Sequence, residues 1–211
     1  MIDISKYKGV TFVDPSSVWI EDTVVIGEGC VIEPNVYLRG ETVLGENVTI
    51  GFGTQIVNSK IADGVTVKHS LVTDSTIGKG TTVGPFAYIR PNCVVGENVK
   101  IGDFVEIKNS NIDDGTKLSH LTYVGDADVG KNINFGCGTV IVNYDGKSKH
   151  RTVIEDNAFI GCNTNLVSPV RIGKNAYTAA GSTITEDVPA NSLAIARNRQ
   201  CVKEDWVNKR K

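Results

Sequence analysis

Residues 76–107 read TIGKGTTVGPFAYIRPNCVVGENVKIGDFVEI, and the spacing of their aliphatic residues decides the fold. A branched aliphatic side chain recurs at every sixth position: Ile77, Val83, Ile89, Val95, Ile101 and Ile107. Four of these residues are followed directly by glycine. A period of six matches neither the 3.6-residue period of an α-helix nor the simple alternation of a long strand. It fits short strands joined by turns, and the chain is therefore expected to wind as a solenoid.

The same spacing extends from this stretch in both directions. Before it, the six-residue series runs from Ile20 to Ile56, and after it a last series runs from Ile154 to Ile184. Small or β-branched residues stand two places before the aliphatic ones, as Cys30 does before Ile32, so both should face one stacked core. Glycine after the aliphatic residue is expected to supply a corner conformation that other residues resist.

The repeats predict an all-β chain, a parallel β-helix in which each hexapeptide is one strand and one corner. Three hexapeptides make a triangular coil, and successive coils bond along the axis at about 4.8 Å. We expect three parts: a lead-in over residues 1–16, the β-helix over 17–188, and a C-terminal tail over 189–211.

Composition excludes several classes of function. The 211 residues are 40% hydrophobic and carry a net charge of −2, which is not the surface of a protein built to bind nucleic acid or an anionic membrane. No signal peptide or membrane span is indicated, and the five cysteines form no CxxC pair. A cytoplasmic protein with reduced thiols is expected.

The six-residue rhythm breaks over residues 117–151, KLSHLTYVGDADVGKNINFGCGTVIVNYDGKSKHR. A regular scaffold is expected to carry its chemistry where the repeat is interrupted. The spacing from Ile141 to Ile154 is one position longer than two hexapeptides, so its polar loop should project and wall a cleft.

Arg90 and Lys108 are separated by three hexapeptides, which is one full coil. They should therefore stack on one edge of the prism, about 4.8 Å apart along its axis. Two cations held this close favour a bound anion.

Four segments carry a resemblance to a known family. They are YIRPNCVVGENVKIGDFVEIKNSNI, SHLTYVGDADVGKNINFGCGTVIVNYDGKSKHRTVI, AFIGCNTNLVSPVRIG and AAGSTITEDVPANSLAIARNRQ. They resemble the acetyltransferase domain of the bifunctional glucosamine-1-phosphate N-acetyltransferase / N-acetylglucosamine-1-phosphate uridylyltransferase, a hexapeptide-repeat acyltransferase. The similarity covers nearly the whole chain. HLTYxGDAxxG with NYDG is far more specific than the hexapeptides alone.

The resemblance implies a left-handed β-helix, a homotrimer, and acetyl transfer from acetyl-CoA to the 2-amino group of glucosamine 1-phosphate without a metal. The product would feed UDP-N-acetylglucosamine and hence peptidoglycan and cell-wall synthesis. The family's uridylyltransferase domain is not among these 211 residues, so that second activity is expected to be absent.

Residue roles also follow from the resemblance. Spacing alone would leave His120 a surface or structural histidine, but the family match makes it the expected base, and an imidazole with an ordinary pKa of about 6.5 suits that role. The expected substrate ligands are Arg90 and Lys108 on the phosphate, Tyr123 and Asn134 on the sugar, and Lys149 from a neighbouring subunit. The expected acetyl-CoA ligands are Cys137, Asn143, Tyr144, Cys162, Ala180 and Arg197. Cys137 and Cys162 stand where many members carry Ala and Ser.

Three alternatives stay open. The chain could acetylate another amino sugar, or it could be a non-catalytic trimeric scaffold. A γ-class carbonic anhydrase would need three histidines on adjacent strands to hold zinc. The separations between His69, His120 and His150 are not whole numbers of three-hexapeptide coils, so this alternative is disfavoured. His69 and His150 are expected to be solvated or structural.

Overall fold

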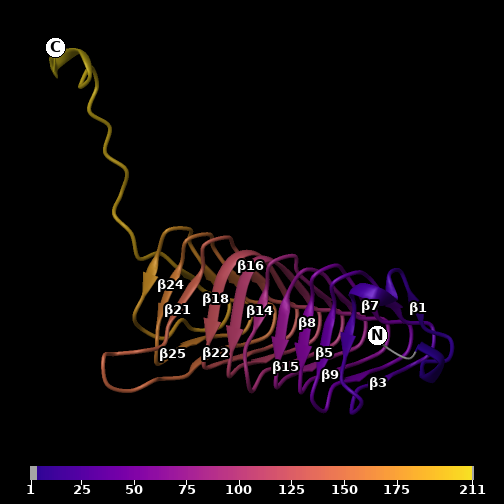
Figure 1. Ribbon diagram of the computed structural model, residues 1–211. Coiled ribbons are helices and arrows are strands. Elements are labelled where there is room, and N and C mark those ends of the chain that lie inside the picture. Colours follow the sequence, from indigo (N-terminus) through magenta and orange to yellow (C-terminus); the bar gives the residue numbers. More distant parts are fainter. Residues whose placement is uncertain (1–3, 211) are drawn as a thin grey trace.

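The computed structural model describes residues 4–210, and the predicted left-handed parallel β-helix runs from Thr11 to Ala194 (Figure 1). A nine-stranded parallel sheet makes one face of the prism: β3 (Val25–Ile26), β6 (Val43–Leu44), β9 (Lys60–Ile61), β12 (Thr76–Ile77), β15 (Val94–Val95), β17 (Asn111–Ile112), β19 (Ala127–Val129), β22 (Thr152–Ile154) and β25 (Val170–Ile172). The expected all-β parallel fold is confirmed.

A 19-stranded sheet makes the other two faces. One of these two faces holds β1 (Thr11–Phe12), β4 (Val31–Ile32), β7 (Thr49–Ile50), β10 (Thr66–Val67), β13 (Thr82–Val83), β20 (Asn134–Phe135), β23 (Phe159–Ile160), β26 (Tyr177–Thr178) and β28 (Leu193–Ala194). The other holds β2 (Trp19–Ile20), β5 (Tyr37–Arg39), β8 (Gln55–Val57), β11 (Leu71–Thr73), β14 (Tyr88–Ile89), β21 (Val140–Val142), β24 (Asn165–Val167) and β27 (Thr183–Ile184). Two long strands join these faces: β16 (Lys100–Lys108) and β18 (Lys117–Gly125). Short 3₁₀ helices cover Ile4–Lys6, Pro15–Ser17 and Asn208–Arg210.

The core follows the six-residue pattern. Ile77, Ile89 and Ile107 are fully buried, and so is Cys30, which stands two places before Ile32. The ladder reaches beyond the expected 17–188 at both ends, because β1 pairs with β4 and β28 with β26. Residues 1–3 of the expected lead-in and residue 211 of the tail lie outside the described residues. After β28 the chain leaves the prism as an extended arm (Figure 1).

The glycines after the aliphatic residues have a different role from the one expected. In the repeat, left-handed backbone falls two residues later, at Asn47 (φ 55°) and Asn98 (φ 53°). A Cβ on Gly78 would lie 2.4 Å from the backbone of Gly96 in the next coil. These glycines are needed because successive coils approach closely, and Gly84 (φ 98°) in addition has positive φ.

Gly78→Ala is therefore expected to lower the free energy of unfolding by about 1–3 kcal/mol, since the new methyl group meets backbone that cannot move aside. Urea unfolding measures the change. Gly64→Asn is the matched control, because nothing lies within 4 Å of a Cβ at Gly64 and asparagine tolerates its positive φ. Equal midpoints for Gly78→Ala and the parent protein would contradict this explanation.

The loop after β21 is longer than the spacing suggested. Ile112 pairs with Val129 in one coil, and Val129 pairs with Ile154 in the next. The coil from Val129 to Ile154 is longer than the coil from Ile112 to Val129 by more than one hexapeptide. The segment from Ile141 to Ile154 thus holds a single hexapeptide and an insertion, not two hexapeptides with one extra residue. Tyr144 and Lys149 form an isolated antiparallel bridge across this exposed hairpin.

Candidate functional site

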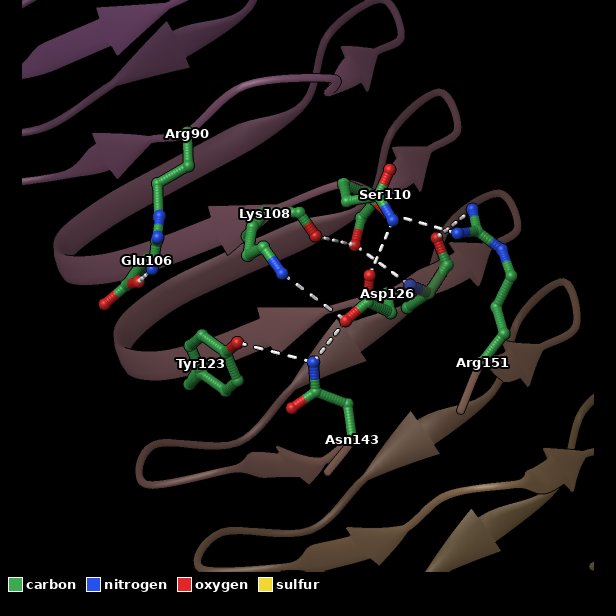
Figure 2. A network of polar contacts seen from close by, with 10 residues as sticks. Arg90, Glu106, Lys108, Ser110, Tyr123, Asp126, Asn143 and Arg151 are labelled. Atoms are coloured by element: carbon green, nitrogen blue, oxygen red, sulfur yellow. Dashed lines mark hydrogen bonds and ion pairs between the residues drawn. The ribbon is translucent and has the colours of Figure 1, made fainter. Parts of the chain in front are cut away.

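Two cations lie side by side at the edge where β14 and β16 end. The Arg90 backbone N–H donates to the Ile107 carbonyl at 2.8 Å, and Ile89 pairs with Ile107, so Arg90 stands beside Lys108. The predicted stacking of the two residues is confirmed. In Figure 2 the Arg90 side chain reaches Glu106, and the Lys108 side chain points toward Asp126.

A third cation joins this edge, and two carboxylates partly balance the charge. Arg90 Nη1 lies 2.7 Å from Glu106 Oε1, and Lys108 Nζ lies 3.7 Å from Asp126 Oδ2. The ammonium group of Lys149, followed by burial, lowers the pKa of Lys108. Lys149 therefore approaches Lys108 within the same chain, and its expected reach into a neighbouring subunit stays a prediction.

Asp126 is the centre of this polar network (Figure 2). Its side chain is 9% exposed and accepts a hydrogen bond from Asn109 Nδ2 at 2.5 Å and another from Asn143 Nδ2. Burial opposes ionisation of this carboxyl group, but the two amide donors and the charges of Lys108 and Lys149 lower its pKa. The ionised carboxylate fixes the positions of Lys108 and Asn143.

Gly125 leaves room for the side chain of Tyr123, the tyrosine of the HLTY segment, beside this network. A Cβ on Gly125 would lie 2.4 Å from the Tyr123 hydroxyl oxygen and 2.8 Å from Asn143 Nδ2. Tyr123 is half-buried, and its hydroxyl is 3.5 Å from Asn143 Nδ2. Asn143, expected at the coenzyme, lies beside Tyr123, which is expected at the sugar, and both roles stay predictions.

Arg151 anchors the inserted hairpin to the prism, at the end where the chain re-enters β22. Its guanidinium donates to both carboxylate oxygens of Asp128 at 2.6 Å and to the carbonyl groups of Asn109 and Ala127. The pair holds the base of the hairpin, and hence Asn143, at a fixed place in the network (Figure 2).

His120 lies at a corner of the prism, in the middle of β18. Its side chain is 63% exposed, and Nδ1 lies 2.9 Å from Asp103 Oδ1 in the preceding coil. Because β16 and β18 run unbroken around this corner, Asp103 and His120 are paired in register. Tyr123 follows three residues later on the same strand.

The corner column continues from His120 through residues expected at the coenzyme. Leu118 pairs with Phe135 and Tyr123 with Val140, which places His120 beside Cys137. The next registers place Cys137 beside Cys162, and Cys162 beside Ala180. The Arg197 side chain lies near Gly181, with its Cδ 3.7 Å from a Cβ built there. Both cysteines are exposed free thiols.

The other expected site residues lie apart from these two groups. Asn134, on β20, is half-buried on the face that precedes the His120 corner. The hydroxyl group of the exposed Tyr144 donates a hydrogen bond to the Gly146 carbonyl oxygen in the hairpin. Sequence reasoning missed Asp103, Asn109 and Asp126. Only Asp126 had a signal, because it is the acidic residue of the quoted GDA motif.

The histidines do not converge. His69 packs between the rings of Phe52 and Phe86, with centroids 5.7 and 4.7 Å away, and His150 Nε2 lies 2.7 Å from Asp145 Oδ2. Within residues 4–210, no group of three or more histidine, cysteine or acidic side chains could hold a metal ion. No helix in that part of the chain is long and apolar enough to cross a membrane.

Two family models and two solved structures are similar to this chain. Residues 15–99 match the family model described as GMPPB C-terminal domain, and residues 151–186 match the bacterial transferase hexapeptide (six repeats). A crystal structure of UDP-N-acetylglucosamine acyltransferase has a TM-score of 0.55 and 22% identity over 88% of this chain and 71% of its own. The Campylobacter jejuni enzyme of that name has a TM-score of 0.50 and 19% identity over 94% and 81%. These two likenesses concern the fold alone.

Sequence relatives are far more similar. The bifunctional protein GlmU of Acetivibrio thermocellus is 61% identical over 202 residues, which are 96% of this chain and 44% of that protein. GlmU of Clostridioides difficile is 55% identical over the same shares, and GlmU of Brevibacillus brevis is 55% identical over 95% of this chain and 44% of its own. The chain thus spans less than half the length of these relatives.

Proposed function

This chain belongs to the same family as the C-terminal part of the bifunctional GlmU proteins, and on that premise we propose that it is an acetyltransferase that converts glucosamine 1-phosphate to N-acetylglucosamine 1-phosphate. The acetyl donor is acetyl-CoA. The product is a precursor of UDP-N-acetylglucosamine and hence of the cell wall. The acceptor needs a phosphate site, for which Arg90 and Lys108 are proposed, and a proton acceptor, for which His120 on the adjacent strand β18 is proposed.

The observation that carries the proposal is the edge formed by Arg90, Lys108 and Lys149. The guanidinium group of Arg90 and the ammonium group of Lys149 both act on the ammonium group of Lys108, whose side chain is only 19% exposed. The three cations repel one another, and their carboxylate partners balance the charge only in part. The remaining repulsion is relieved when a dianion binds between the cations. A sugar phosphate supplies that dianion, whereas free glucosamine does not.

His120 is the proposed base. Its Nε2 takes a proton from the 2-amino group as the nitrogen attacks the thioester carbonyl. The tetrahedral intermediate then collapses, the bond from carbon to sulfur breaks, and the coenzyme leaves as a thiolate that takes up the proton. Holding amine and thioester together supplies a large part of the acceleration.

The donor is proposed to lie along the corner column beyond His120. Cys137, Cys162 and Ala180 present small side chains in three successive coils, which leaves room for an extended chain beside them. Arg197, close to this column at Gly181, is the proposed cation for a coenzyme phosphate. Asn143 and Tyr144 are proposed to contact the coenzyme from the hairpin.

Thiol release from acetyl-CoA, with the sugar product identified by NMR, tests the proposed reaction. We expect release to require glucosamine 1-phosphate and to yield the 2-acetamido sugar in equal amount. Thiol release at the same rate with and without acceptor would be hydrolysis and would contradict the proposal, and no release above the protein-free background would favour a scaffold. Faster turnover of another amino sugar would shift the proposal to that acceptor.

We also propose that the chain acts as a homotrimer, with each site built between two copies. Phe52, Phe86 and Phe104 form an exposed aromatic column with His69, and the Phe86 and Phe104 rings are stacked at 5.5 Å. These three phenylalanines are 49–58% exposed. Leu121, also 58% exposed, is the immediate neighbour of His120. The aromatic column and Leu121 together form an apolar ridge that leads to the proposed base, and such a ridge is suited to contact with a second copy.

Phe86→Asp is expected to convert the trimer to monomers, because it places a charge in the middle of this ridge. Sedimentation velocity measures the change. Val25→Asp is the matched control, since Val25 is 57% exposed on β3, which belongs to the nine-stranded sheet. Intact trimers for Phe86→Asp, or monomers for both variants, would show that the ridge is not the contact.

The C-terminal arm is the second proposed contact between copies. It leaves the prism after β28 (Figure 1), and it exposes 70% of Val202, 46% of Trp206 and 67% of Val207. Such side chains on an extended arm favour packing against a neighbour. We propose that residues 189–211, which include the arm, cross to a neighbouring copy and complete its coenzyme site.

A further inference from the structure

Asp103 and His120 form a carboxylate–imidazole pair across two coils. They are register partners on β16 and β18, and Asp103 Oδ1 lies 2.9 Å from His120 Nδ1. The contact uses the ring nitrogen nearer the backbone, so Nε2 is directed away from the carboxylate. The part of the imidazole that could reach a substrate is thus the part that Asp103 leaves unengaged.

The backbone holds both side chains at a corner that has little freedom to adjust. The residues that follow them, Phe104 (φ 56°) and Leu121 (φ 35°), have positive φ, which is costly for a bulky side chain. The Thr122 hydroxyl donates to the His120 carbonyl at 2.7 Å. Seven register pairs between β16 and β18, on both sides of the corner, tie the two coils together.

The charge of Asp103 determines which ring nitrogen of a neutral His120 carries hydrogen. The hydrogen bond from His120, and then one from the backbone, lower the pKa of Asp103, so its carboxylate is ionised at neutral pH. An ionised carboxylate can only accept, and therefore a neutral imidazole bonded to it must donate from Nδ1. Nε2 then carries a lone pair.

We propose that Asp103 is a positioning residue of the acetyl-transfer reaction, which holds His120 in the tautomer with hydrogen on Nδ1 and a free lone pair on Nε2. This inference rests on the proposed function, in which Nε2 accepts the proton of the sugar amine. During that step Nε2 gains the proton and the ring becomes an imidazolium. Asp103 keeps its negative charge and stabilises that cation. Without the carboxylate, part of the imidazole population would present N–H to the amine and could not accept its proton.

Two measurements on Asp103→Ala test the assignment. Long-range ¹H–¹⁵N correlation spectra of the ¹⁵N-labelled protein, recorded where histidine is neutral, distinguish the tautomers, and His120→Ala assigns the signals. We expect the hydrogen on Nδ1 in the parent protein and a mixed or Nε2-protonated ring in Asp103→Ala. In the kinetic assay kcat should fall at least about tenfold with little change in KM for either substrate, because proton transfer is impaired and binding is not. Asp103→Asn keeps an acceptor oxygen without the charge, so its kcat should lie between that of the parent protein and that of Asp103→Ala.

Asp114→Ala is the matched control. The Asp114 carboxylate is 47% exposed and lies 2.9 Å from Lys131, against 42% and 2.9 Å for Asp103 with His120. The Asp114→Ala substitution should change neither the tautomer of His120 nor kcat. An unchanged tautomer in Asp103→Ala, or a kcat loss of the same size in Asp114→Ala, would overturn the inference. A tautomer change in a parent protein that transfers no acetyl group would sustain the pairing and overturn the proposed function instead.

Discussion

His120→Ala should lower kcat for acetyl transfer by about 10²–10⁴-fold, which is the usual contribution of a positioned general base. The sugar amine would then have to lose its proton to water while it attacks. KM for glucosamine 1-phosphate should change little, because the cations at the edge of β14 and β16 remain. The thiol-release assay measures both constants. Since the His120 side chain is 63% exposed, its removal leaves no buried cavity, and the fold should be intact.

A His120→Gln variant separates the base from a simple hydrogen-bond donor. Glutamine can bond to the amine but cannot take its proton, so its kcat should be as low as that of the alanine variant. Lys117→Ala, on the same strand, is the control for loss of an exposed side chain. Turnover by His120→Ala close to that of the parent protein would remove His120 from the mechanism.

Arg90→Ala should raise KM for glucosamine 1-phosphate by about 10–100-fold, since hydrogen bonds to charged groups contribute about 1.5–3 kcal/mol. Lys108→Ala should have a similar effect. It should also lower the free energy of unfolding, because it leaves the buried Asp126 carboxylate without its nearest cation. Steady-state kinetics and urea unfolding measure the two effects.

Unphosphorylated glucosamine provides the internal control for these variants. Its residual turnover, however slow, should not depend on Arg90, because it has no phosphate for the guanidinium to bind. Lys100→Ala, an exposed cation at the start of β16, should leave KM unchanged. Equal losses with both acceptors would mean that Arg90 supports the fold or the coenzyme and does not bind the phosphate.

Much of the fold could be predicted from the sequence because a solenoid repeats one local rule. Each aliphatic residue of the series from Ile77 to Ile107 is in the core, since the six-residue spacing and the strand alternation act on the same side chains. The role of the following glycines was less accessible. Their need comes from contact between coils, as at Gly78 and Gly96, and that distance is not encoded in the spacing.

The candidate site divides in the same way. The neighbourhood of Arg90 and Lys108 could be predicted, because both lie one full coil apart in a regular stretch. The roles of Asp126 and Asp103 could not, because each of them contacts a partner across a coil that is one position shorter than three hexapeptides. The inserted hairpin was also misjudged, since the spacing after Ile141 does not show how much of the chain remains in the ladder.

The acceptor preference of the unmodified protein is the most direct test of whether it acetylates glucosamine 1-phosphate. Values of kcat/KM for glucosamine 1-phosphate, glucosamine 6-phosphate and glucosamine should be compared in one thiol-release assay at saturating acetyl-CoA. We expect the 1-phosphate to be preferred over both others by at least about tenfold, because the cations bind a phosphate at a fixed position relative to the amine. Equal values for all three acceptors, or no turnover with any of them by a folded trimer, would contradict it.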